Sequence, residues 1–219
     1  MNPKRFILIV CFMSLTIRAQ DTIIDSDYDW ETLKATYTLH YYKHLTTANF
    51  KQFQSGIAQM SLVDVSYYGY DHKVHRGQIV CHQSVAEELQ SIFRQLLWIK
   101  FPISSVIPMS EFNFDDHLSM HNNNTTCFDF RLKTLKNGWS KHAYGIAIDL
   151  NPRQNPFVSR QGVFPDNALS FLSQGRIRAD DFKGMQVIRI FAMYGWRWGG
   201  YWSSSKDYMH FQKNSLPAN

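Results

Sequence analysis

The stretch SKHAYGIAIDLNP contains two side chains that commonly bind metal ions, His142 and Asp149. If the residues between them form a β-strand, alternation places Asp149 on the same face as Gly145 and Ala147, whose side chains are minimal. Such a face leaves room for a group that is not protein. His142 has the wrong parity for this face, so we expect it in the turn before the strand. The alternative is an aspartate that caps a turn and an ordinary loop histidine.

A third candidate ligand is His210 in the segment DYMHFQ, where it lies between Met209 and Phe211. A buried imidazole needs a polar partner, and a metal ion is one such partner. A catalytic zinc typically has three protein ligands and one open position. His142, Asp149 and His210 could therefore bind zinc together, and a satisfied core histidine is the alternative for His210. The remaining histidines lie in hydrophilic or helical segments: His40, His44, His72, His75, His82, His117 and His121.

Two further residues could complete a hydrolytic site. Asp207 precedes His210 by three residues, and in a turn before the strand it could take a proton from the attacking water. Arg131 closes the segment NNNTTCFDFR and could stabilise a developing oxyanion with fixed donors. The alternatives are an exposed aspartate and an ordinary surface arginine.

The elements that must position these residues follow from periodicity and turn residues. We expect short helices over 27–59, two strands around the turn GYDHK and a helix from Ser84 to Lys100 that ends before Pro102. The segments SSVIPMSEF and CFDFR are predicted as strands, and NFDDHLSMHNNN as a polar loop. A long loop is expected over 151–175. A second helix follows a cap at Asp180 or Asp181 and ends at Gly195, before the strand-like segments GWRWGGYW and DYMHFQ.

Helices and short strands are interspersed in this pattern, which indicates an α+β fold with a small antiparallel sheet flanked by helices. The chain has 219 residues, of which 44% are hydrophobic, and this suits one domain with a substantial core. We divide it into residues 1–20, a helical segment 21–60 of uncertain role, and a catalytic domain 61–219.

The first twenty residues have the order of a secretory signal peptide. Lys4 and Arg5 precede the apolar run FILIVCFMSLTI, which is too short for an ordinary membrane-spanning helix. A retained membrane anchor is the alternative. We therefore expect export to the periplasm or the exterior and no membrane span in the mature chain.

Removal of this segment also removes most of the excess positive charge. The full chain has a net charge of +5, and the loss of Lys4, Arg5 and Arg18 leaves twenty Lys and Arg against eighteen Asp and Glu. No basic stripe remains, so we do not expect nucleic-acid binding. The remaining cysteines, Cys81 and Cys127, could form one disulfide or stay as free thiols.

Taken together, SKHAYGIAIDLNP, NNNTTCFDFR and GWRWGGYWSSSKDYMHFQ resemble the zinc peptidases of bacterial peptidoglycan. These include D-alanyl-D-alanine carboxypeptidases, vancomycin-resistance D,D-peptidases and the L-alanyl-D-glutamate endopeptidases of phage endolysins. The combination of S-x-H-x(6)-D with [DE]-x-x-H-F some sixty residues later carries the resemblance. It extends more weakly from Ser61 to Gln212, and nothing before Ser61 has a counterpart.

The resemblance implies zinc at His142, Asp149 and His210, Asp207 as the catalytic base, and Arg131 as the group that polarises the scissile carbonyl. It also implies the fold of the hedgehog signalling domain. Many relatives have Glu in place of Asp207. The shorter carboxylate also occurs in the endolysin branch, which this chain resembles in that respect.

The resemblance therefore implies a zinc peptidase that cleaves an amide bond in peptidoglycan stem peptides. From the signal-peptide pattern we expect it to be secreted, and we expect a monomer. The cleaved bond could be L-Ala-D-Glu or D-Ala-D-Ala, and the former is slightly favoured because no cationic residue dedicated to a terminal carboxylate can be located. The alternative is a catalytically silent, zinc-containing module that binds the cell wall. The aromatic residues Trp196, Trp198, Tyr201 and Trp202 could form a platform for the substrate or belong to the core.

Overall fold

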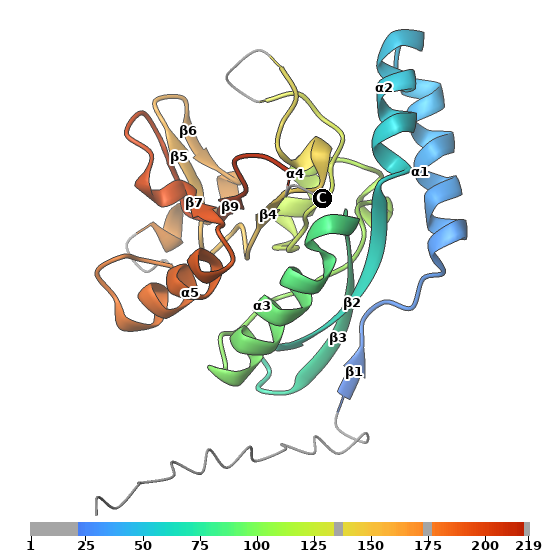
Figure 1. Cartoon of the computed structure of the whole chain (residues 1–219). Helices are drawn as coiled ribbons and strands as arrows, with labels where there is room; N and C mark the ends of the chain where they lie inside the picture. Colours follow the sequence, from blue (N-terminus) through green and yellow to red (C-terminus); the bar gives the residue numbers. More distant parts are fainter. Residues whose placement is uncertain (1–21, 134–137, 173–176, 217–219) are drawn as a thin grey trace, which may run out of the picture.

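Three small sheets and five α-helices form the part of the chain that the computed structural model describes, residues 22–133, 138–172 and 177–216 (Figure 1). The helices are α1 (Trp30–His44), α2 (Thr47–Ile57), α3 (Ala86–Trp98), α4 (Asp116–His121) and α5 (Phe182–Met193). The strands are β1 (Thr22–Ile24), β2 (Met60–Tyr68), β3 (Val74–His82), β4 (Ala147–Asp149), β5 (Phe157–Ser159), β6 (Gly162–Phe164), β7 (Arg197–Trp198), β8 (Lys206–Asp207) and β9 (His210–Gln212). The sheet orders are β1-β3-β2, β4-β9-β7 and β6-β5-β8. The predicted α+β fold is thereby confirmed.

The largest sheet is built on the hairpin of β2 and β3. The hairpin predicted around GYDHK is confirmed, and its strands pair antiparallel from Met60↔His82 to Tyr68↔Val74. The strand β1 adds to β3 in parallel, a pairing that the sequence did not predict. The predicted helix after the hairpin is confirmed as α3, which packs against β2.

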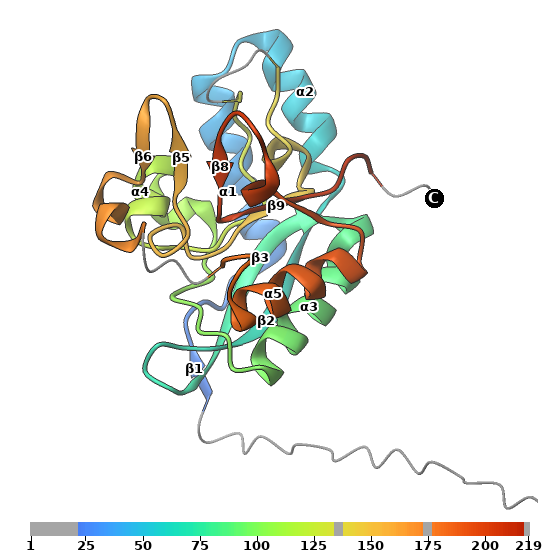
Figure 2. The same cartoon turned by 90° about the vertical axis from the view of Figure 1, so that its left-hand side faces the viewer.

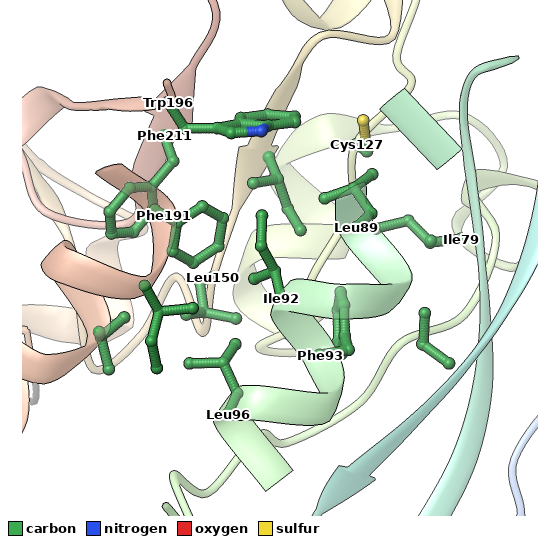
Figure 3. Close-up of a cluster of buried hydrophobic side chains, with 14 of the residues drawn as sticks. Ile79, Leu89, Ile92, Phe93, Leu96, Cys127, Leu150, Phe191, Trp196 and Phe211 are labelled. Carbon is green, nitrogen blue, oxygen red and sulfur yellow. The ribbon is translucent and has the colours of Figure 1, made fainter. Parts of the chain in front are cut away.

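The main hydrophobic cluster lies between α3, α5 and the strands that carry the site (Figure 3). Its α3 residues recur at helical spacing: Leu89, Ile92, Phe93 and Leu96. Phe191 of α5 stacks on Phe211 of β9 with ring centroids 3.9 Å apart. Asp181 caps α5 as predicted, because its side chain accepts a hydrogen bond from the Gly184 amide. Phe211 therefore packs β9, the strand that carries His210, against α5.

A second cluster forms where α1 and α2 cover the segment that precedes the site. Figures 1 and 2 show these two helices side by side at one end of the molecule. Tyr37, Tyr41 and Phe53 are buried against Phe128 and Phe130. The Phe130 amide also donates to the Tyr41 hydroxyl at 3.3 Å. The N-terminal helices thus hold the backbone on either side of residue 129.

The strand predicted for SSVIPMSEF is wrong. This segment is irregular and ends in the 3₁₀ turn Met109–Phe112. Pro108 has no amide hydrogen for a ladder, and two amides that a strand would use are bonded to side chains instead. The Ser104 amide donates to Asn151 Oδ1, and the Ile107 amide donates to Asn124 Oδ1.

Three other local predictions also differ from the structure. The predicted loop NFDDHLSMHNNN contains α4, because the Asp115 side chain caps the Leu118 amide. CFDFR is not a strand, since the Phe128 amide bonds to Val80 and the Asp129 amide to His142. The expected loop over 151–175 contains the hairpin of β5 and β6, in which β5 also pairs with β8.

Both described cysteines, Cys81 and Cys127, are buried free thiols. The disulfide that the sequence left open is therefore absent. The predicted signal peptide, residues 1–20, lies outside the described residues. Among the residues that are described, no helix has the length and apolar character needed to cross a membrane.

Candidate metal centre

Two of the three predicted ligands face each other across one pair of strands. Asp149 on β4 lies directly opposite His210 on β9. The Leu150 amide donates to the Met209 carbonyl, so Asp149 and His210 form a non-hydrogen-bonded pair of the antiparallel ladder. Opposite side chains lie closer together in such a pair than in a hydrogen-bonded one. Asp149 Oδ1 lies 2.9 Å from His210 Nδ1, and both side chains are buried.

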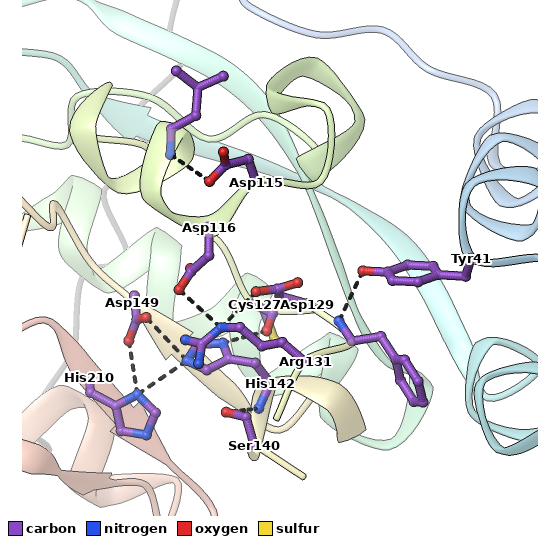
Figure 4. A network of polar contacts seen from close by, with 12 residues as sticks. Tyr41, Asp115, Asp116, Cys127, Asp129, Arg131, Ser140, His142, Asp149 and His210 are labelled. Atoms are coloured by element: carbon purple, nitrogen blue, oxygen red, sulfur yellow. Dashed lines mark hydrogen bonds and ion pairs between the residues drawn. The ribbon is translucent and has the colours of Figure 1, made fainter. Parts of the chain in front are cut away.

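His142 lies in the 3₁₀ turn His142–Tyr144 that precedes β4. The sequence predicted this position, because side-chain alternation along the strand excluded His142 from the face of Asp149. Gly145 ends this turn with a φ of 61°, a left-handed conformation that glycine adopts without strain. His142 Nε2 lies 3.2 Å from Asp149 Oδ2 and 3.2 Å from His210 Nδ1. One ligand atom from each of the three residues lies within 4.8 Å of the other two (Figure 4).

The outer nitrogen of each imidazole has an acceptor that fixes the ring. His142 Nδ1 lies 2.7 Å from the Cys127 carbonyl oxygen, and His210 Nε2 lies 3.0 Å from Gln212 Oε1. When these nitrogens donate, His142 Nε2 and His210 Nδ1 carry lone pairs that point toward the same place.

Burial and the ion pairs within this group shift its ionisation. Burial alone raises the pKa of Asp149, but the charges and hydrogen bonds of His142 and His210 outweigh it and hold that pKa well below its ordinary value. Burial lowers the pKa of His210, yet Asp149 reverses this and raises the pKa to about 9. The buried carboxylate therefore favours a cation between itself and the two rings.

The donor set fits zinc. Two imidazole nitrogens and one carboxylate oxygen are ligands that zinc accepts, and three protein ligands leave a position for solvent or substrate. Two imidazole lone pairs facing each other also repel unless a proton or a metal cation lies between them. Among the residues that the structure describes, this is the one group of three with such geometry.

Asp207 lies at the end of β8, and the bend at Tyr208 and Met209 separates it from His210. Its Oδ1 is buried without a hydrogen-bond partner among the described residues. Burial raises the pKa of Asp207 to about 7, against the opposing charge of His210. Gly199 packs behind it, since a Cβ there would lie 2.9 Å from the Asp207 Cβ. An unpartnered carboxyl group with this pKa suits proton transfer near neutral pH.

Arg131 lies beside the three ligands and is held by two carboxylates. Its Nε lies 2.8 Å from Asp129 Oδ2 and 3.1 Å from Asp116 Oδ2 (Figure 4). Burial lowers the pKa of Arg131, but the charges of Asp116, Asp129 and Asp149 outweigh this and raise it. Burial and Asp116 raise the pKa of Asp129 to about 7, although Arg131 opposes the shift. The Arg131 guanidinium therefore stays charged, and both carboxyl groups hold it at Nε.

Sequence reasoning missed Asp116, Asp129 and Gln212. Asp129 and Gln212 each stand two residues from a candidate site residue, a spacing that places side chains on one face of an extended chain. Asp116 gave no comparable signal, because α4 was predicted as a loop.

The aromatic residues of the segment GWRWGGYW lie partly in the core and partly near the candidate metal centre. Trp196 and Trp198 are buried, which confirms the core alternative for these two. Tyr201 is 60% exposed, and the Trp202 ring lies 5.3 Å from that of His210, measured between centroids. Trp202 thus lies beside the centre, and for Tyr201 and Trp202 the platform stays a prediction.

Comparison with known families confirms the resemblance in the C-terminal part of the chain. Residues 134–213 match the model of a family described as D-alanyl-D-alanine carboxypeptidase. The members of this family are zinc peptidases. The match includes His142, Asp149, Asp207 and His210, whereas Arg131 and the helices α1 to α4 lie before it. No curated protein and no solved structure gives a significant match to the chain.

Proposed function

We infer, from the match of residues 134–213 to zinc peptidases, that the chain is an exported zinc peptidase that hydrolyses an amide bond in the stem peptides of peptidoglycan. The proposed ligands are His142, Asp149 and His210. The observation that carries the proposal is the convergence of their ligand atoms within 4.8 Å, although one of them lies more than sixty residues from the others.

Each side chain around the centre has its own role in amide hydrolysis. Bound zinc would act as a Lewis acid toward water and the scissile carbonyl. Asp207 takes a proton from the attacking water as the carbon–oxygen bond forms, and it returns that proton to the nitrogen as the carbon–nitrogen bond breaks. Arg131 donates hydrogen bonds to the oxyanion of the tetrahedral intermediate. Asp116 and Asp129 hold the guanidinium in place, so little reorganisation accompanies the reaction.

Two bonds in the stem peptide are candidates. The family description names the D-Ala-D-Ala bond, whose cleavage requires recognition of a terminal carboxylate. The second candidate is the L-Ala-D-Glu bond, which the sequence slightly favoured. It is supported by Arg131, which is assigned to the oxyanion and already paired with Asp116 and Asp129, so that it is not free to recognise a terminal carboxylate.

Digestion of purified sacculi and of defined muropeptides tests the proposal. We expect new amino groups to be released, mass spectrometry to show which bond is cut, and a chelator to stop the release. His210→Ala should be inactive, and His121→Ala, which changes an exposed histidine on α4, should retain activity. Zinc-loaded protein that binds sacculi but releases no amine would favour the cell-wall-binding alternative instead.

A further inference from the structure

We propose that Gln212 is a positioning residue that fixes the ring of His210 for metal binding, an inference that rests on the proposed function. Gln212 follows His210 by two residues on β9, so both side chains project from the same face of the strand. His210 Nε2 lies 3.0 Å from Gln212 Oε1.

The sheet gives the Gln212 side chain the space for this contact. β9 is the central strand between β4 and β7, and Gln212 lies opposite Ala147 on β4. The Ala147 side chain ends at Cβ and is fully buried, so it leaves the neighbouring volume to the longer amide. The small residues between His142 and Asp149 therefore make room for the group that supports His210.

The contact determines which nitrogen of His210 binds the metal. A metal ligand must present a lone pair, and Nδ1 is the nitrogen that faces Asp149 and His142. The ring proton then resides on Nε2, where Gln212 Oε1 accepts it. This bond selects the tautomer, restricts rotation of the ring and makes Nδ1 more basic. His142 is held in the same way by the Cys127 carbonyl, so each imidazole has its own acceptor.

Zinc affinity measures this role directly. We suggest competition titrations with a chromogenic chelator on the purified wild type and three variants. Gln212→Met keeps the length of the side chain and removes the acceptor, whereas Gln212→Glu keeps the acceptor. The matched control is Gln161→Met, which makes the same change at an exposed position in the turn between β5 and β6. Thermal unfolding of the metal-free proteins checks that each variant is folded.

We expect Gln212→Met to bind zinc about 10–100-fold more weakly than the wild type, as for other groups that support metal-binding histidines. Gln212→Glu and Gln161→Met should bind zinc as the wild type does. Nitrogen-15 spectra of the histidine rings should show the proton of His210 on Nε2 in the zinc-loaded wild type.

Two results would overturn the inference and leave the proposed function intact: unchanged zinc affinity in Gln212→Met, or equally weak binding in Gln212→Glu. A wild-type protein that binds no zinc would overturn the proposed function itself, and the role of Gln212 with it.

Discussion

Asp207 has a buried carboxylate oxygen without a described partner, an arrangement that costs stability whenever the group is charged. We predict that Asp207→Asn retains zinc and loses turnover by about 10²–10⁴-fold, because an amide cannot accept the proton. The same change should raise the unfolding midpoint of the metal-free protein at pH 8, where the wild-type carboxylate is ionised. Zinc content, initial rates and calorimetry measure these effects, and Asp27→Asn at an exposed position is the control. Normal turnover in Asp207→Asn would remove it from the mechanism.

The raised pKa of Asp207 also predicts the pH dependence of turnover. The base must be deprotonated, so kcat/KM should rise with pH and level off once the pH exceeds this pKa. Burial places the pKa at about 7, and a nearby divalent cation lowers it because it favours the charged form. We therefore expect the acid limb at or below pH 7. Rates between pH 4 and 9 test this, with zinc content measured at each pH to separate metal loss. Activity that is flat down to pH 4 in zinc-loaded protein would contradict it.

Arg131 offers a fork of donors that lysine cannot reproduce. Arg131→Lys preserves the charge between Asp116 and Asp129 but loses the planar geometry that the two carboxylates fix. We expect kcat to fall by about 10–10³-fold with little change in zinc affinity. Steady-state kinetics beside a zinc titration would show this split. Equal kcat in the variant would mean that Arg131 only balances the charge of the carboxylates.

The sequence indicated the residues that converge in the structure better than the residues that support them. The small residues on the face of Asp149, the turn position of His142 and the apolar neighbours of His210 made these three candidate ligands, and the structure brings them together. Asp116 could not be found in this way, since its contact with Arg131 depends on how α4 folds back over the site. The sequence places Gln212 near His210, but only the register with Ala147 shows that its side chain has room to reach the ring.

Prediction of whole elements succeeded where periodicity was long and uninterrupted. The β2–β3 hairpin and α3 each contain enough residues for the pattern to determine the type of element. It failed where side chains replace the backbone as hydrogen-bond partners, as Asn124 and Asn151 do for residues 104–107. It also failed for β5 and β6, whose three-residue strands are too short to show alternation.

Gly145 connects the turn that carries His142 to β4, and it tolerates no side chain. Its φ is 61°, and a Cβ there would lie 2.5 Å from the His82 amide nitrogen. We predict that Gly145→Ala lowers the free energy of unfolding by about 2–4 kcal/mol and weakens zinc binding, because the turn must move. Gly56→Ala on α2 is the matched control. Its Cβ would meet only one atom, at 4.0 Å, so helix propensity should stabilise it by about 0.5–1 kcal/mol. Denaturant unfolding measures both, and equal effects would contradict the prediction.

At the scale of the molecule, the candidate metal centre joins the two hydrophobic clusters. The turn of His142 contributes Ala143 to the cluster under α1 and α2. β4 and β9 contribute Ile148 and Phe211 to the cluster under α3 and α5. A cation bound by His142, Asp149 and His210 would therefore link the two halves of the core as well as provide the chemistry.

Removal of the metal should then lower the thermal stability of the folded protein. A ligand that binds only the folded state stabilises it by about 2.7 kcal/mol at a free concentration 100 times its Kd. For a chain of this size each kcal/mol shifts the midpoint by about 2–4 °C, so a chelator should lower the midpoint by about 5–10 °C. Added zinc should restore it. His210→Ala is the control, because its midpoint should not respond to zinc or chelator. Equal responses in the wild type and His210→Ala would show that the stabilising ion binds elsewhere, and the link between the two clusters would be wrong.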